Sequence, residues 1–306
     1  MKKHEKSIQS RLNRASQKYY WAMILPGLVL VAIFYYGPMF GITMAFQDYV
    51  PAKGILGSKW VGLKHFKAML AIPDCWRILR NTLALSFGKI FGTMLLAIVF
   101  AILLNEIRIT RFKKITQTIV YLPHFLGWVV LAGVVRNILG PDGLLNALLE
   151  LLNLEKLNFF GSDKLFQPLL IGTGIWKEFG YSSVIYLAAL TSVDPGQHEA
   201  AAMDGANWWQ RVWHITLPGM LPVILVVAAM NVARILNAGF DQVYTLYSPL
   251  VYESGDIIDT YVYRIGLVSR RYSFGAAVGL MKSVIGLTLM VSMNELCKKF
   301  ANRRIF

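Results

Sequence analysis

The chain has 306 residues, of which 56% are hydrophobic, and it carries a formal net charge of +14. Its mean hydropathy of +0.49 and its apolar content exceed what is usual for soluble globular domains, so composition predicts a membrane protein. Basic residues collect at the ends of apolar segments rather than on one continuous face, which argues against binding to nucleic acid. Cys75 and Cys297 are too few and too far apart for a disulfide framework or a metal site.

The apolar segments predict an all-α fold with six transmembrane helices. A helix needs about 20 apolar residues to cross the core of a bilayer. The polar and basic segment 1–18 precedes them, and we expect it to form a short amphipathic helix on anionic headgroups. The first apolar segment is too long for a signal-peptide core and lacks an A-x-A exit, so we expect it to be retained. In chain order, the predicted spans are 19–46, 79–104, 116–139, 168–192, 219–237 and 275–297, followed by a basic tail at 298–306.

The distribution of Lys and Arg predicts the orientation of these helices. If the N-terminus is cytoplasmic, the inner segments contain 15 basic residues, and the outer segments, which are longer in total, contain ten. The density is therefore about twofold higher inside, which predicts that both termini are cytoplasmic. This orientation also places the polar segment 193–218 on the cytoplasmic side.

Segment 193–218 has the pattern of a helix–turn–helix outside the bilayer. Ala200 to Met203 are strong helix formers, and Glu199 near the expected helix start suits the positive end of the helix dipole. Gly205 permits the left-handed conformation that closes a helix, and Pro218 lies where the next helix would begin.

This segment resembles the E-A-A-x3-G-x9-I-x-L-P loop of ABC importer permeases, and it matches every fixed position of that pattern, from Glu199 to Pro218. In that family the loop is the coupling helix, which docks into a cleft of a cytoplasmic ATPase. The resemblance implies that the ATPase is contacted by Glu199, Ala200, Ala201, Asp204, Gly205 and Arg211.

The resemblance extends over nearly the whole chain. Segments similar to Gram-positive polysaccharide permeases of the LplB/YteP type, within the MalF-like type I importers, are Tyr35–Ile42, Gly172–Tyr181, Asp194–Glu199 and Tyr247–Tyr263. It implies a type I ABC importer permease fold in the plasma membrane of a Gram-positive bacterium. It implies a subunit that moves oligosaccharides or polysaccharide fragments into the cytoplasm by alternating access. The implied partners are a second homologous permease in a heterodimer, two cytoplasmic ATPase subunits, and an extracellular lipid-anchored sugar-binding protein.

Catalytic motifs are missing from the sequence. Gly88-Lys89 is followed by Ile90 and lacks the upstream glycine of a phosphate-binding loop. His198-Glu199 begins like a zinc-protease helix, but Ala202 stands where the second histidine is needed. We therefore expect a non-catalytic subunit that binds no metal or cofactor, with ATP and Mg on the partner ATPase.

Polar side chains within the predicted spans are candidates for substrate binding. A charge at the centre of a span costs about 2.5–3.5 kcal/mol on insertion scales and usually faces a cavity or a partner. Aromatic rings beside a carboxylate in span four suit a sugar rich in hydroxyls, and three polar residues spaced by three in span five are expected on one helix face. The predicted substrate residues are Trp176, Glu178, Tyr181, Asn231, Arg234, Asn237 and Lys282.

Several alternatives remain open for these residues. Arg234 could pair with Glu178, and Lys89 and Lys282 could meet the second permease rather than a ligand. The sequence permits an acidic sugar but does not require one. It also leaves open which sugar is carried and which ATPase is used.

Two other functions compete with an importer. A secondary transporter or channel often has paired intramembrane carboxylates and an inverted repeat. Here Glu178 is the one strong intramembrane carboxylate, and no convincing repeat is found. A scaffold for an extracellular enzyme would need larger outer segments than the three short ones predicted.

Overall fold

The computed structural model describes residues 2–301, with side chains for 17–292, 294 and 295. Met1 and residues 302–306, which belong to the predicted amphipathic segment 1–18 and the predicted tail 298–306, lie outside the described residues. The helices are α1 (Lys2–Val31), α2 (Gly37–Met39), α3 (Gly54–Gly57), α4 (Lys64–Leu70), α5 (Pro73–Glu106), α6 (Thr110–Phe125), α7 (Trp128–Leu139), α8 (Leu144–Leu151), α9 (Asp163–Leu190), α10 (Pro195–Met203), α11 (Trp208–Arg211), α12 (Leu217–Val232), α13 (Phe240–Leu246), α14 (Tyr252–Gly255), α15 (Ile258–Tyr261) and α16 (Tyr272–Ala301). Short π-helical and 3-10 segments and two short antiparallel strands, β1 (Gln47–Asp48) and β2 (Lys59–Trp60), accompany these α-helices.

Among the described residues, five helical stretches are long and apolar enough to cross a membrane. They are Gln17–Phe46, Pro73–Glu106, Trp128–Leu151, Trp208–Val232 and Tyr272–Ser292. The predicted fourth span, 168–192, corresponds to α9, which is 28 residues long but does not pass this test of hydropathy. The reason is the polar stretch at its middle, where Lys177 and Glu178 lower the mean hydropathy.

The predicted third span is not one helix. We expected a continuous helix over 116–139, but α6 ends at Phe125 and α7 begins at Trp128. Pro123 lies in the last turn of α6, and Gly127 adopts an extended conformation before α7. A run of apolar residues shows that a segment is buried in lipid or protein, but it does not show where the helix is interrupted.

The predicted fifth span, 219–237, is displaced along the chain. The helical stretch begins at Trp208, passes through a π-helical turn at Val212–Thr216, and continues as α12 to Val232. Proline has no N–H group and disrupts the regular hydrogen bonds of a helix. Pro218 is the second residue of α12, as predicted for a helix start, but the wider π-turn directly before it joins α11 and α12 into one helical stretch.

Helix α9 lies at the centre of the bundle, where it contacts α5, α6, α12, α13 and α14. Gly88 and Gly92 of α5 make room for Ile171 and Ile175 of α9. A Cβ atom at Gly92 would overlap Cδ1 of Ile175, so α5 and α9 approach closely at this point. Small residues four apart permit such close packing between membrane helices.

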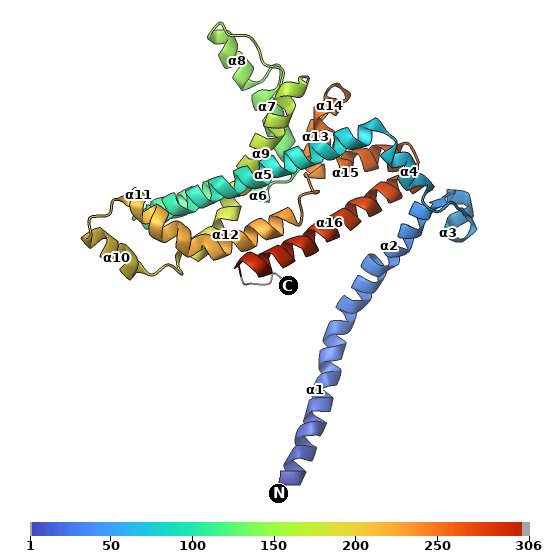
Figure 1. Ribbon diagram of the computed structural model, residues 1–306, viewed down its shortest axis with the longest axis horizontal. Coiled ribbons are helices and arrows are strands. Elements are labelled where there is room, and N and C mark those ends of the chain that lie inside the picture. Colours follow the sequence, from blue (N-terminus) through green and yellow to red (C-terminus); the bar gives the residue numbers. More distant parts are fainter. Residues whose placement is uncertain (1, 302–306) are drawn as a thin grey trace.

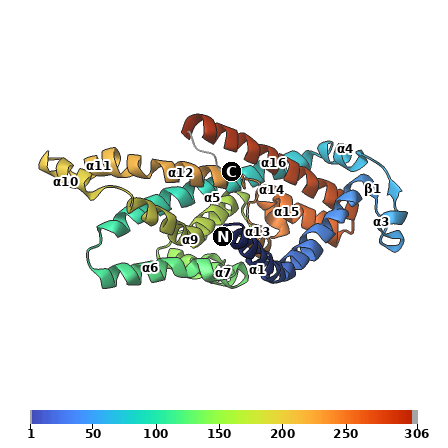
Figure 2. The ribbon, with the colours of Figure 1, turned by 90° about the horizontal axis from the view of Figure 1, so that it is seen from below.

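Different helices lie at the two ends of the molecule's long axis. Figure 1 shows α10 and α11 at one end of this axis, and α3 and α4 at the opposite end. Helix α1 projects away from the body, and none of the apolar window in Gln17–Phe46 is buried within the chain. Seen from below, α9 lies between α5 and the α6–α7 pair (Figure 2). An apolar helix without contacts in its own chain needs lipid or another subunit to cover it.

Candidate functional site

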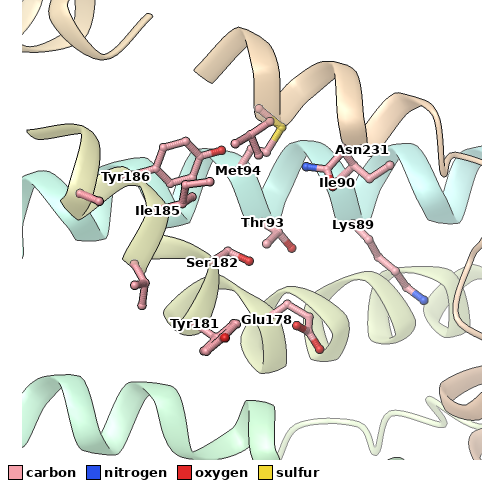
Figure 3. Close-up of a pocket in the computed structure, with 13 residues that line it drawn as sticks. Lys89, Ile90, Thr93, Met94, Glu178, Tyr181, Ser182, Ile185, Tyr186 and Asn231 are labelled. Atoms are coloured by element: carbon pink, nitrogen blue, oxygen red, sulfur yellow. The ribbon is translucent and has the colours of Figure 1, made fainter. Parts of the chain in front are cut away.

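A cavity of about 560 Å³ lies between α5, α9 and α12 (Figure 3). Its volume is within the range of about 300–1,000 Å³ that is typical of small-molecule sites. Apolar side chains form much of the wall, with a few polar groups among them, which is the composition expected of a ligand site. The lining residues are Lys89, Ile90, Thr93, Met94, Glu178, Tyr181, Ser182, Val184, Ile185, Tyr186, Ala188, Val227 and Asn231. Three of the predicted substrate residues therefore line the same cavity, namely Glu178, Tyr181 and Asn231.

Glu178 is held in place by groups that the sequence did not connect with it. Oε2 of Glu178 accepts a hydrogen bond from Nδ1 of His124 at 2.8 Å, and the His124 ring stacks on Tyr181 with centroids 4.0 Å apart. Oε1 of Glu178 lies 3.6 Å from the ammonium of Lys177. The proposed pairing of Arg234 with Glu178 is therefore wrong, because neighbours on α6 and α9 occupy the carboxylate.

Lys177 stabilises the break between α6 and α7. Its side chain is 9% exposed, and its ammonium donates to the backbone carbonyls of His124 at 2.6 Å and Pro123 at 3.3 Å. At the end of α6 the carbonyl of Pro123 also accepts a hydrogen bond from the N–H of Leu126 at 3.2 Å, and a cation suits the negative end of a helix dipole. Lys177 therefore has a structural role at the end of α6. This contact could not be predicted from the sequence, because the two segments are more than 50 residues apart.

The other predicted substrate residues lie elsewhere. Arg234, Asn237 and Lys282 line a second cavity of about 250 Å³ between α16 and the turn that follows α12. Lys282 pairs with Asp259 at 2.5 Å. Trp176 is 42% exposed and lines neither of these two cavities.

The expectation that Asn231, Arg234 and Asn237 share one helix face is wrong. Asn231 belongs to the last turn of α12, which ends at Val232, whereas Arg234 and Asn237 lie in the turn beyond it. The N–H of Arg234 donates to the carbonyl of Asn231 at 3.0 Å, and the N–H of Asn237 donates to the carbonyl of Arg234 at 2.8 Å. These tighter bonds bend the chain, so the three side chains face two cavities.

Tyr186 was missed as a site residue although the sequence contains a signal for it. Glu178, Ser182 and Tyr186 are spaced by four residues, which places them on one face of α9. All three line the first cavity. The Tyr186 hydroxyl is buried and has no hydrogen-bond partner in the described part of the chain.

Helix α10 forms the first half of the predicted helix–turn–helix. It begins at Pro195, capped by Asp194, whose side chain accepts a hydrogen bond from the N–H of Gly196 at 2.9 Å. Glu199 is therefore in the middle of α10, and the expectation that it lies near the helix start is wrong. Gly205 has φ +81°, which confirms the predicted left-handed conformation.

A Schellman motif closes α10. The N–H of Ala206 donates to the carbonyl of Ala201 at 2.9 Å, and the N–H of Gly205 donates to the carbonyl of Ala202 at 3.1 Å. Helix α11 then begins with a capping box between Asn207 and Gln210. Both helix ends are thus fixed by local hydrogen bonds, so the turn can keep its shape while it is exposed to solvent.

The turn between α10 and α11 surrounds a surface pocket of about 320 Å³, lined in part by Ala201, Asp204, Gly205 and Arg211. Glu199 and Ala200 are exposed on α10. Neither Glu199 nor Asp204 forms an ion pair with another described residue, so both carboxylates are available to a cation on a partner.

Comparison with known proteins identifies the family. Residues 94–301 match the family described as "Binding-protein-dependent transport system inner membrane component". The chain is 44% identical to the polygalacturonan/rhamnogalacturonan transport system permease protein YteP of Bacillus subtilis, covering 99% of this chain and 95% of YteP. This chain belongs to that permease family.

Further relatives agree with the assignment. Protein LplB of Bacillus subtilis is 39% identical, covering 94% of this chain and 91% of LplB. A solved bacterial alginate ABC transporter, in complex with an alginate pentasaccharide-bound periplasmic protein, contains a chain with TM-score 0.86 and 34% identity, covering 95% of this chain and 98% of the other. The resemblance to LplB/YteP-type permeases is therefore confirmed, and the chain is an ABC transporter permease rather than a secondary transporter or a scaffold.

Proposed function

We propose that this permease carries oligosaccharides or polysaccharide fragments from an extracellular binding protein into the cytoplasm, by ATP-driven alternating access. The observation that carries the proposal is the cavity between α5, α9 and α12, where polar groups project into a mainly apolar space of sufficient size for a sugar. The relatives named for polygalacturonan/rhamnogalacturonan and alginate support a saccharide as the substrate.

In this proposal the chain crosses the membrane six times. Helix α9 is the span that hydropathy does not detect, because Lys177 and Glu178 at its middle lower the mean hydropathy. At 28 residues it is about 42 Å long, which exceeds the roughly 30 Å of a bilayer core. The spans are α1, α5, the interrupted α6–α7, α9, α12 and α16, so both termini are cytoplasmic, in agreement with the distribution of Lys and Arg.

The same topology places α10 and α11 in the cytoplasm, where α10 docks on an ATPase. The exposed carboxylates of Glu199 and Asp204 form polar contacts, Ala200 and Ala201 permit close approach, and Gly205 sets the direction of the turn. Arg211 adds a contact from α11. ATP and Mg bind to two copies of this ATPase, and the permease itself is not catalytic.

The exposed apolar surface of α1 supports the proposal that the complex contains a second permease subunit. An apolar helix that buries nothing within its own chain can pack against a homologous permease in a heterodimer. A lipid-anchored sugar-binding protein would dock at the opposite end of the long axis from α10, near α3 and α4. The Bacillus subtilis relatives support the plasma membrane of a Gram-positive bacterium as the location of the complex.

Within the first cavity, Glu178 and Asn231 would form hydrogen bonds with sugar hydroxyls, and the Tyr181 ring would add a stacking surface. Arg234, Asn237 and Lys282 would contact the sugar at the second cavity. Trp176 lines neither cavity, and we propose that its aromatic ring stacks on the sugar, as predicted from the sequence.

Reconstitution tests this function. The chain would be co-purified with the products of neighbouring genes, placed in liposomes, and given radiolabelled oligogalacturonides with the binding protein outside and ATP inside. We expect uptake that requires ATP and the binding protein. Uptake driven by an ion gradient without ATP, or the absence of any saccharide uptake by an assembled and ATP-hydrolysing complex, would contradict the proposal.

A further inference from the structure

Lys89 places an amino group at the centre of the membrane-spanning region. It lies at the midpoint of α5, which runs from Pro73 to Glu106, and it lines the first cavity beside α9 (Figure 3). Its ammonium donates a hydrogen bond to the carbonyl of Ala238 at 2.6 Å, in the segment between α12 and α13. Charged side chains at this depth are costly and generally face a functional cavity or a partner.

Two glycines shape the space around the lysine side chain. A Cβ atom at Gly174 of α9 would lie 3.2 Å from Cδ and Cε of Lys89. At Gly239, where φ is +88°, a Cβ atom would lie 3.6 Å from the Lys89 Nζ. The aliphatic stem is therefore held in a fitted slot between α5 and α9, and the ammonium has a fixed position.

Lys89 has no carboxylate partner among the residues that the structure describes. A lysine ammonium has three donors, and the carbonyl of Ala238 is the acceptor that the described residues supply. No described carboxylate lies within 4.0 Å of it, in contrast to Lys177 and Lys282, which have Glu178 and Asp259. Glu178 lines the same cavity, but its carboxylate is already engaged by His124 and Lys177.

We infer that the cavity is built for sugars that carry carboxylates, and that Lys89 binds the carboxylate of a uronic acid residue. This inference rests on the proposed function and specifies its substrate class. Thr93, one turn along α5, and Asn231 on α12 provide neutral polar groups for the hydroxyls of the same sugar. Lys89 then distinguishes an acidic sugar from a neutral one, because the neutral sugar leaves the ammonium without a counter-ion.

The inference is tested with two sugars that differ in charge. Uptake of trigalacturonate and of its fully methyl-esterified form would be measured with the complete reconstituted transporter. The variants are Lys89→Met and Lys89→Arg, with Lys156→Met as a matched control that removes a lysine exposed at the surface. Comparing each variant with the wild type for the same sugar cancels the selectivity of the unchanged binding protein. The same two sugars would be tested for equilibrium binding to the permease–ATPase complex in nanodiscs without the binding protein.

We expect Lys89→Met to lower the ratio of trigalacturonate uptake to esterified-sugar uptake at least tenfold. The corresponding ratio of binding affinities should fall at least tenfold as well. Lys89→Arg should restore most of this ratio, and Lys156→Met should leave it within twofold of the wild type. An equal loss for both sugars would show that Lys89 supports the Ala238 turn or meets a carboxylate of the second permease, and this would overturn the inference. An unchanged ratio would also overturn it. The proposed function fails separately, if the wild type carries neither sugar nor any other saccharide.

Discussion

Replacement of Gly205 by proline should reduce ATP-driven sugar uptake at least tenfold while the protein still inserts and assembles in the membrane. Gly205 has φ +81°, whereas the ring of proline fixes φ near −65°. Proline also removes the N–H that donates to the carbonyl of Ala202 in the Schellman motif. The turn between α10 and α11 must therefore change direction, and the docking surface around Asp204 is lost.

The matched control is Gly205→Asn. Asparagine tolerates the left-handed conformation better than other residues with a side chain and keeps its N–H, so uptake should remain within about threefold of the wild type. Uptake by liposomes and complex assembly by size-exclusion chromatography would be measured for both variants. Undiminished uptake by the Gly205→Pro variant would contradict the role of this turn in coupling.

Glu178→Gln should lower sugar uptake at least tenfold, as measured by initial rates at several sugar concentrations. The substitution removes a strong acceptor from the cavity and leaves the ammonium of Lys177 without its carboxylate. Loss of a hydrogen bond to a charged group costs about 1.5–3 kcal/mol, and about 1.4 kcal/mol corresponds to a tenfold change in an equilibrium constant.

Glu155→Gln provides the control, because it removes one carboxylate from an exposed residue outside the cavities described above. Its uptake rates should equal those of the wild type. If Glu178→Gln complexes assemble normally and transport at the wild-type rate, Glu178 does not take part in sugar binding.

Much of the fold could be predicted from the sequence where one local signal was sufficient. Long apolar runs located α1, α5 and α16, and the spacing around Gly205 predicted its left-handed conformation. The α6–α7 break was not predicted, because Pro123 and Gly127 lie within a continuous apolar run, and the contact of Lys177 with this helix end comes from a distant segment. The continuation of the helical stretch back to Trp208 was not predicted, because a π-turn joins α11 to α12 directly before Pro218, which a proline-based rule does not anticipate.

The candidate site could be predicted only in part for the same reason. Polar residues within apolar segments led to Glu178, Tyr181 and Asn231, which line one cavity, and their role in sugar binding stays a prediction. The spacing of Asn231 and Arg234 suggested a shared face only as long as the helix was assumed to continue beyond Val232. Contacts between distant segments, such as that of His124 with Glu178, became visible only in three dimensions.

Site-specific crosslinking tests the central claim, that α10 is the cytoplasmic contact with the ATPase, most directly. Met203, which is 88% exposed on α10, and Leu56, which is fully exposed on α3 at the opposite end, would each be replaced by cysteine in a chain whose native cysteines are changed to serine. With a short thiol-to-amine crosslinker applied to the assembled complex, we predict that Met203→Cys links to the ATPase and that Leu56→Cys does not. Crosslinking of the ATPase through Leu56→Cys, or labelling of Met203→Cys by an impermeant reagent from outside intact cells, would contradict the account.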